Sequence, residues 1–444
     1  MAADVPAQIV AKRELFLASG DNELIDELVK LQEQDGGWRA ALPMAINGVI
    51  LVPHDPKPVL VLLNLLYQAR QGDLIDAVVV LLSETGLHPA VGLYYDGASK
   101  LLKGNLRGAL KVMDRLNSSN MLRTDVMGAI RATASQIGAE ALEKLGDYRR
   151  AYAAYVELNR IDPGKPYDLE EYGRTIAANN ALVVPPLPTD SRTDCVVMTG
   201  FPRSGTTLLE NALAAHPLIE TFEEIPTSTS MQIYLDLTLP TLASEADTTP
   251  VFLATRDRYY AEMDRLRRKA AARVLVDKMP MRSAEAVFLK RLMPDKKFIF
   301  SIRHPFDVVL SCFKQQFVRN VAMEHFRTFE GAVKLYDFTM GQWFSAHDMS
   351  DPLVHYLKYD TLVTAFEPSM RAALHFLGLE WDEAVTHFAE AAERRAARTP
   401  SYQKVRQGLS IGVQSSWRNY GFLFQSEAAR PLYRWAEFFG YETK

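Results

Sequence analysis

A short glycine-containing loop combines the residue types and the spacing that phosphate binding requires. The segment Gly200-Phe-Pro-Arg-Ser-Gly-Thr-Thr207 follows the apolar run Cys195–Met198 and precedes a helical stretch from Thr207 to His216. It agrees with the G-x-x-x-x-G-K-[ST] pattern of nucleoside-triphosphate loops, except that Thr206 stands in the lysine position. Backbone N–H groups at a helix N-terminus bind phosphate without that lysine, but its contact to the β- and γ-phosphates is lost. The loop therefore predicts a phosphate site for a nucleotide with a different reactive end.

The loop resembles that of the sulfotransferases that use 3′-phosphoadenosine 5′-phosphosulfate (PAPS). The segment Thr199–Pro217 is similar to the 5′-phosphosulfate loop of tyrosylprotein sulfotransferases and their bacterial relatives, and the resemblance extends over about residues 190 to 440. It implies a P-loop-like parallel α/β sheet sandwiched by helices, and an enzyme that releases PAP as a product. The loop residues that it assigns to the donor are Arg203, Ser204, Gly205, Thr206 and Thr207.

A second motif, Ser301–Ser311, follows another apolar run that we expect to be a buried strand. The resemblance implies that Arg303 and Ser311 hold the 3′-phosphate of PAPS. Arginine offers a charged fork to a phosphate, and a serine hydroxyl adds a neutral donor from the following helix. His304 is expected to shape the turn before Pro305 rather than to act as an acid or base.

A third motif lies near the C-terminus, where Arg406-Gln407-Gly408 and Trp417–Tyr420 resemble the R-K-G and W-K-N elements that close over the nucleotide. Arg406 and Gly408 are therefore assigned to the donor, although Gln407 replaces the middle basic residue. Between residues 391 and 418 one acid, Glu393, accompanies six basic residues, namely Arg394, Arg395, Arg398, Lys404, Arg406 and Arg418. Such a cluster indicates an anionic partner or a solvated helix face.

Sulfuryl transfer requires a base for the acceptor hydroxyl and a cation that faces the departing phosphate. The resemblance assigns the base to a carboxylate shortly after His216-Pro217, and counting from that pair favours Glu223 over its neighbour Glu224. It assigns the cation to Lys278. Ser401 matches a serine beside the sulfuryl group, with Thr399 as the alternative.

The first 175 or so residues contain successive helical patterns with a weak internal repeat. Gly72 and Gly146 each begin the same series of Asp, Ala, a large apolar residue and Pro, and Gly104 begins a partial copy. The spacing is near the ~34 residues of a tetratricopeptide repeat, in which a small alanine and a large apolar residue one turn later let two helices pack closely. The alternative is an ordinary helical domain with unrelated helix C-caps.

Three prolines between residues 181 and 194 interrupt the helical pattern and predict a domain boundary. We therefore expect an all-α tetratricopeptide-like domain over 1–185 and a sulfotransferase domain over 186–444. Additional strand candidates in the second domain are Val274–Val276, Lys297–Ile302 and Val354–Leu357. Strands that alternate with helices favour a parallel sheet.

Composition excludes several other classes of protein. The chain has 444 residues, 48% of them hydrophobic and 23% charged, with a net charge of −4, so it offers no global basic field for nucleic acid. It contains two cysteines and no apolar run that suits a leader or a membrane span, which predicts a cytoplasmic protein. Its histidines lack paired ligand spacing, so no metal site is predicted.

The sequence thus predicts transfer of the sulfuryl group of PAPS to a hydroxyl acceptor. Helical-repeat grooves bind extended peptides, and the loop resembles that of tyrosylprotein enzymes, so a peptide or protein hydroxyl is expected, with tyrosine as a candidate. Thr221 stands where those membrane-anchored enzymes carry a cysteine, which leaves carbohydrate and small-molecule acceptors open. A nonenzymatic scaffold with a degenerate nucleotide-binding domain is the alternative from another class, and Thr206 disfavours a kinase.

Overall fold

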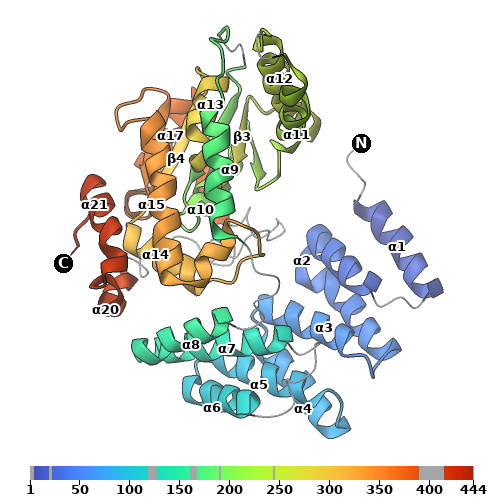
Figure 1. Cartoon of the computed structure of the whole chain (residues 1–444). Helices are drawn as coiled ribbons and strands as arrows, with labels where there is room; N and C mark the ends of the chain where they lie inside the picture. The colour runs from blue at the N-terminus through green and yellow to red at the C-terminus, as the bar shows by residue number, and fades with distance from the viewer. Residues whose placement is uncertain are drawn as a thin grey trace. The chain divides into compact units, whose positions relative to one another are not determined.

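The computed structural model describes residues 5–19, 23–118, 128–160, 168–189, 192–243, 246–389 and 415–443 (Figure 1). The chain divides into two compact units. The first comprises Met1–Pro166, and the second contains almost all of the chain from Tyr167 to Lys444. Each unit has its own core, and each is described by itself below.

The first unit is all-helical in the residues that the structure describes, as the sequence predicts. Its helices are α1 (Val5–Ser19), α2 (Glu23–Leu51), α3 (Pro56–Gln68), α4 (Gly72–Thr85), α5 (Pro89–Leu102), α6 (Leu106–Ser118), α7 (Gly128–Lys144) and α8 (Tyr148–Arg160). From α4 to α8, each helix packs against the next one in the chain. Gly104 and Gly146 adopt left-handed φ values of 77° and 83° in the turns before α6 and α8, where a side chain would be strained.

The packing expected of the repeat pattern holds in two of its three copies. Ala109 with Met113 on α6, and Ala151 with Tyr155 on α8, are all buried. In the copy that begins α4, by contrast, the equivalent Leu81 is 57% exposed. The packing explanation therefore fails for that helix, and a tetratricopeptide relationship stays a prediction.

The second unit is built on a five-stranded parallel sheet in the order β2-β3-β1-β4-β5. The strands are β1 (Cys195–Gly200), β2 (Ile219–Glu223), β3 (Val274–Lys278), β4 (Phe298–Ile302) and β5 (Val354–Lys358). β1, β3 and β4 are buried along their whole length, as expected for apolar strands covered on both faces. The edge strand β2 is more polar, and the sequence pattern did not identify it as a strand.

Helices cover both faces of this sheet, which confirms the predicted fold class (Figure 1). The described helices of this unit are α9 (Leu169–Ala181), α10 (Thr206–Ala214), α11 (Thr229–Thr238), α12 (Thr249–Leu266), α13 (Ala286–Leu292), α14 (Pro305–Lys314), α15 (Phe329–Ala346), α16 (Tyr359–Thr364), α17 (Phe366–Leu377), α20 (Gly421–Phe424) and α21 (Arg430–Phe438). On one face, Val196 and Val276 form a core with residues of α10 and α17. On the other, Phe300 of β4 stacks on Trp343 of α15 with 4.3 Å between the ring centroids.

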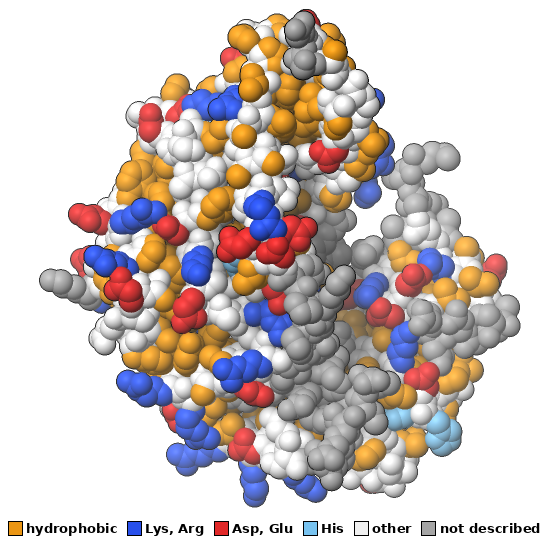
Figure 2. Space-filling view, in the orientation of Figure 1, with side chains coloured by type: hydrophobic (Ala, Val, Ile, Leu, Met, Phe, Trp, Pro, Cys, Tyr) orange, Lys and Arg blue, Asp and Glu red, His pale blue; other side chains and the backbone are white. Residues whose placement is uncertain are grey.

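The surface carries charges of both signs (Figure 2), as the small net charge of the sequence leads us to expect, and both cysteines are unpaired. Basic and acidic side chains both occur on the face that Figure 2 shows. Cys195 and Cys312 are free and buried, and burial raises the pKa of the Cys195 thiol to about 12. No helix among the described residues is long and apolar enough to cross a membrane.

The carboxylate of Asp307 joins the C-terminal segment to α14. It accepts hydrogen bonds from the backbone N–H groups of Ser415 and Trp417, both at 3.0 Å, and from the hydroxyl of Ser416 at 2.9 Å. Asp307 itself is buried in the first turn of α14, one turn after Arg303. A single buried acid therefore fixes the start of the short helix η8 (Ser416–Tyr420).

Replacing Asp307 by alanine is expected to lower the free energy of unfolding of the second unit by about 2–4 kcal/mol, because three donors lose a charged acceptor. Urea denaturation followed by tryptophan fluorescence measures the change. The control is Asp382→Ala, which removes the acceptor of one backbone N–H, that of Ala384, and is expected to cost about 1 kcal/mol. Equal losses in the two variants would contradict the anchoring role of Asp307.

Candidate active site

The loop between β1 and α10 is held in place by the strands beside it. Ser301 at the end of β4 donates a hydrogen bond to the carbonyl of Ser204 at 2.8 Å. Ser283, which follows β3, donates to the carbonyl of Gly200 at 2.6 Å. The two bonds hold the loop at the start of α10, and a helix N-terminus is a favourable place for a phosphate group.

Three residues that the sequence assigned to the nucleotide lie together at this loop. The Nε of Arg203 donates to the hydroxyl of Ser311 at 3.0 Å, and Nη1 of Arg303 donates to the carbonyl of Arg203 at 3.2 Å. Burial, together with the neighbouring Arg303, lowers the pKa of Arg203. Two guanidinium groups and a serine hydroxyl, all half-buried and close together, are a donor set that suits a phosphate group.

Tyr359 closes this region from the side of β5, and sequence analysis did not identify it. Its ring lies 4.7 Å from the guanidinium carbon of Arg303. It also packs against Gly205, where φ is 99° and an added Cβ would lie 2.4 Å from Tyr359 Cδ2. The available signal was position, since Tyr359 directly follows a strand that ends at the same edge of the sheet.

The remaining loop residues also fit a phosphate group. The hydroxyl of Ser204 is buried and has no hydrogen-bond partner among the described residues. Thr206 and Thr207 form the first turn of α10, and both are buried. A buried hydroxyl and a helix N-terminus at the same loop provide neutral donors to complement the two arginines.

A second cluster joins the predicted base and the predicted cation. β2 and β3 pair in a register that places Glu223 beside Lys278, whose side chain has no exposed surface. The ammonium nitrogen lies 3.5 Å from Glu223 Oε1 and 2.7 Å from Glu224 Oε1. Glu224 adopts a left-handed φ of 49°, and its N–H donates to the carbonyl of Lys278 at 2.9 Å.

The left-handed residue explains how two consecutive acids contact one lysine. Side chains of successive strand residues point to opposite faces, so Glu223 and Glu224 would diverge if the strand continued. The turn at Glu224 instead directs its carboxylate back to the face of Lys278. The side chain of Glu223 is 5% exposed and that of Glu224 is 39% exposed, so Glu224 is the more accessible acid.

The acid–lysine cluster and the phosphate loop lie at the same edge of the sheet. β3 pairs with β1, with Lys278 opposite Met198, and the hydroxyl of Thr199 donates to the carbonyls of Met279 and Pro280 at 3.0 and 2.8 Å. The turn after Lys278 is thereby bonded to the end of β1, directly before the loop. The acid–lysine cluster and the phosphate loop are therefore adjacent at this edge.

Four predicted positions lie outside the described residues, namely Ser401, its alternative Thr399, Arg406 and Gly408.

His304 is described, and its geometry agrees with a role in the turn. Its Nδ1 accepts from the N–H of Phe306 at 3.2 Å, and its Nε2 lies 2.8 Å from the carbonyl of Glu442. Burial lowers the pKa of His304, which favours the neutral ring that these two bonds require. No group of three or more potential metal ligands occurs among the described residues.

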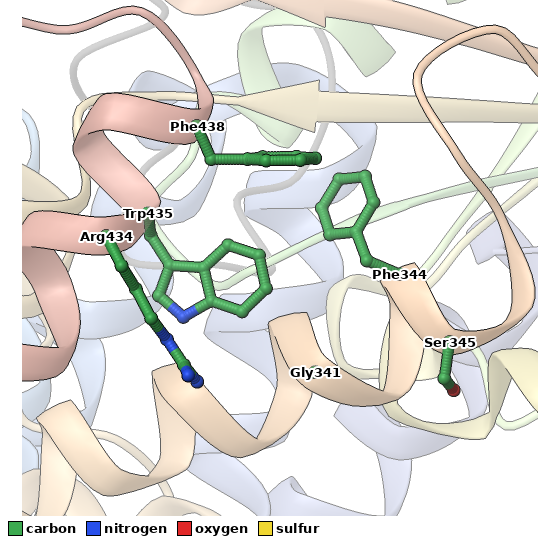
Figure 3. Close-up of a pocket in the computed structure, with 6 residues that line it drawn as sticks. All are labelled: Gly341, Phe344, Ser345, Arg434, Trp435 and Phe438. Carbon is green, nitrogen blue, oxygen red and sulfur yellow. The ribbon is translucent and has the colours of Figure 1, made fainter.

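A separate pocket of about 480 Å³ lies between α15 and α21, away from the residues described above (Figure 3). The rings of Phe344, Trp435 and Phe438 face it, and Arg434 lies at its side. The indole N–H of Trp435 donates to Asp337 at 2.7 Å. None of the described residues that are predicted to bind the nucleotide lines this pocket.

Residues 195–383 match the model of a family described as the sulfotransferase family. These residues are a sulfotransferase-family domain. The matched range includes the phosphate loop, both acids, Lys278, Arg303 and Ser311.

Known proteins that are similar to this chain differ in length from it. An uncharacterized protein of Aquifex aeolicus is 25% identical over 310 residues, which are 65% of this chain and 40% of that protein. Protein-tyrosine sulfotransferase 2 of Gallus gallus is 28% identical over 211 residues, which are 44% of this chain and 54% of that protein. The chain thus spans about half the length of the curated relatives that it matches.

Solved structures of sulfotransferases are also similar to this chain at low identity. The sulfotransferase domain of the Synechococcus PCC 7002 olefin synthase aligns with a TM-score of 0.44 at 19% identity, over 60% of this chain and all of that domain. Mouse sulfotransferase SULT7A1, solved in complex with PAP, aligns with a TM-score of 0.33 at 15% identity, over 60% of this chain and 96% of that one.

Gly205→Ala is expected to weaken the binding of PAP by about tenfold or more, since the new Cβ would collide with Tyr359 at a left-handed position and displace the loop. Isothermal titration calorimetry measures the dissociation constant. Gly341→Ala is the matched control, because it lies inside α15 with no atom within 4 Å of the added Cβ. If Gly205→Ala bound PAP as tightly as the control, the loop would not be the nucleotide site.

Proposed function

We propose that this chain is an enzyme that transfers the sulfuryl group of PAPS to a hydroxyl acceptor. The observation that carries the proposal is the joint placement, at one edge of the sheet, of the Arg203–Ser311 contact and the acid–lysine cluster around Lys278. One group of residues suits a bisphosphorylated nucleotide, and the other suits a proton transfer beside a leaving phosphate. Membership of residues 195–383 in the sulfotransferase family supports the same reaction.

PAPS, the sulfuryl donor, is a substrate with several negative charges, which would lie near Arg203 and Arg303. The loop N–H groups with Ser204, Thr206 and Thr207 would hold the 5′-phosphosulfate, and Arg303 and Ser311 would hold the 3′-phosphate. The hydrogen bond from Arg203 to Ser311 joins the loop to the residues that would hold the 3′-phosphate. Arg406 and Gly408 complete the assignment by resemblance to the wider family.

In the proposed reaction the acceptor oxygen attacks sulfur, a new S–O bond forms, and the S–O bond to the 5′-phosphate breaks. The acceptor proton passes to a carboxylate of the Glu223–Glu224 pair. The negative charge that develops on the phosphate faces the ammonium of Lys278, which is already buried and needs no reorientation of water. PAP leaves with the electrons of the broken bond.

Two arguments bear on which glutamate is the base. Counting from His216-Pro217 favours Glu223, which is also the residue paired with Lys278 across the strands. Exposure favours Glu224, because a general base must come within hydrogen-bonding reach of the acceptor hydroxyl. In either assignment the second acid balances the charge of Lys278.

A peptide or protein hydroxyl, with tyrosine as the first candidate, is the acceptor that we propose. The similarity to a protein-tyrosine sulfotransferase and the all-helical first unit support this choice. Two buried free cysteines suit a reducing compartment such as the cytoplasm. Carbohydrate and small-molecule hydroxyls are the competing acceptors.

Glu→Gln substitutions separate the roles of the two acids. The base variant, Glu223→Gln or Glu224→Gln, is expected to lose about 10²- to 10⁴-fold in transfer rate while PAP still binds. The other variant should lose less, because it removes a charge partner of Lys278 but no proton acceptor. Glu220→Gln is the control, since Glu220 lies on the same strand and accepts N–H bonds from Arg268 and Lys269 instead. Full rates in both Glu223→Gln and Glu224→Gln would refute the catalytic role of the pair.

The acceptor is identified by supplying purified protein with labelled PAPS in a cell lysate and searching for sulfated products by mass spectrometry. Sulfated peptides are the expected result. Sulfated small molecules alone would overturn the peptide acceptor but keep the reaction. Failure of the protein to bind PAPS in calorimetry would overturn the reaction itself and favour the nonenzymatic scaffold.

A further inference from the structure

A buried polar cluster lies on the other face of β3 from Lys278. Asp277 precedes Lys278 in the strand, so the two side chains point to opposite faces of the sheet. The Oδ2 atom of Asp277 accepts hydrogen bonds from the hydroxyls of Thr227 and Tyr259, both at 3.0 Å. Nη2 of Arg282 lies 3.4 Å from the same oxygen and donates to the Thr227 hydroxyl at 3.0 Å.

All four side chains of this cluster are buried, and none of them belongs to the predicted site. Burial, and then the neighbouring Asp277, raises the pKa of Tyr259 well above its ordinary value, so its hydroxyl remains a donor. Charged and polar groups without exposed surface are costly unless they bond to one another, and here Asp277 compensates Arg282. Thr227, Tyr259 and Arg282 thus all meet at one carboxylate oxygen, Oδ2 of Asp277.

Thr227 connects this cluster to the acids of the site. It lies three residues after Glu224, in the loop that leads from β2 to α11. Glu224 has a left-handed φ of 49°, a conformation that a residue with a side chain keeps only when its surroundings fix it. The fixed points are the β2–β3 ladder before Glu224 and the Thr227–Asp277 bond after it.

We propose that Asp277, acting through Thr227, is a positioning residue that holds Glu224 against Lys278. Two adjacent residues of β3 then fix the same loop from opposite faces, because Asp277 binds its far end and Lys278 binds the carboxylates at its start. This inference rests on the proposed sulfuryl transfer. It adds that the geometry of the acids depends on the hydroxyl of Thr227, a residue that is assigned neither to PAPS nor to the sulfuryl acceptor.

The test replaces Thr227 by valine, which keeps the shape of the side chain and removes the hydroxyl. Thr227→Ser restores the hydroxyl and is the rescue variant, and Thr227→Ala is a second variant without it. Thr255→Val is the matched control, because Thr255 is equally buried and its hydroxyl donates only to the carbonyl of Val251 in its own helix. All variants are made in the full chain.

Hydrogen exchange of the Glu224 amide, in the presence of PAP, is the first measurement. We expect exchange about tenfold faster in Thr227→Val and Thr227→Ala, and near wild-type rates in Thr227→Ser and Thr255→Val. Transfer from labelled PAPS to the acceptor used by the wild type should fall about 10- to 100-fold in the variants without the hydroxyl, with an unchanged KM for PAPS.

Wild-type exchange and transfer rates in Thr227→Val would overturn the positioning role. So would equal losses in Thr255→Val, or a failure of Thr227→Ser to restore both rates, since each indicates a general loss of stability. Calorimetry of the wild type with PAP separates this inference from the proposed function. Absence of PAP binding would contradict the function, whereas PAP binding with unaltered exchange in Thr227→Val would contradict the positioning role alone.

Discussion

The buried ammonium of Lys278 is the constraint on which the arrangement of the second unit depends. An unpaired charge without exposed surface would destabilise the fold by several kcal/mol, so opposite charges must lie at contact distance. The edge strand β2 supplies them, because its register with β3 brings Glu223 alongside and the turn at Glu224 adds a second carboxylate. An edge strand with three polar residues is thereby held in the sheet by ion pairs to its neighbour.

Parallel strands impose the second constraint. Their carboxyl ends meet at one edge, so a group placed after each strand comes close to the groups placed after the others. Here every strand contributes one element to that edge, namely the phosphate loop after β1, the acids at the end of β2, Lys278 in β3, Arg303 after β4 and Tyr359 after β5. The placement of these groups at one edge therefore follows from the topology.

Sequence reasoning succeeded where a local pattern carries the information. The loop at Gly200–Thr207 and the apolar strands β1 and β4 are local features, and the parallel sheet was predicted from strands that alternate with helices. The helical first unit was predicted from its own successive helical patterns. It failed for β2, because Glu220, Thr221 and Glu223 leave this edge strand without the continuous apolar run by which the buried strands were found. The contact between Tyr359 and Gly205, and the three bonds of Asp307, were also missed.

These missed features share a physical cause. Each joins residues that are far apart in the chain, and each depends on where two strands or a strand and a helix end in space. Asp307 illustrates the difficulty, since an acid in the first turn of a helix is ordinarily explained by the helix dipole alone. Only the fold brings Ser415 and Trp417 to it. The Thr227–Asp277 bond is hidden in the same way, because it links two segments fifty residues apart.

The two sides of the site carry opposite charge, and this asymmetry orients the proposed substrates. Arg203 and Arg303 lie at the loop, while Glu223 and Glu224 lie beyond Lys278 at the edge strand. A nucleotide with several negative charges is attracted to the first side and repelled from the second, and the strength of both effects is increased by burial. A neutral hydroxyl suffers no such repulsion and can donate a hydrogen bond to a carboxylate. Lys278 lies between the two sides. The S–O bond that breaks and the S–O bond that forms would therefore both lie next to the ammonium group that the two acids hold in place.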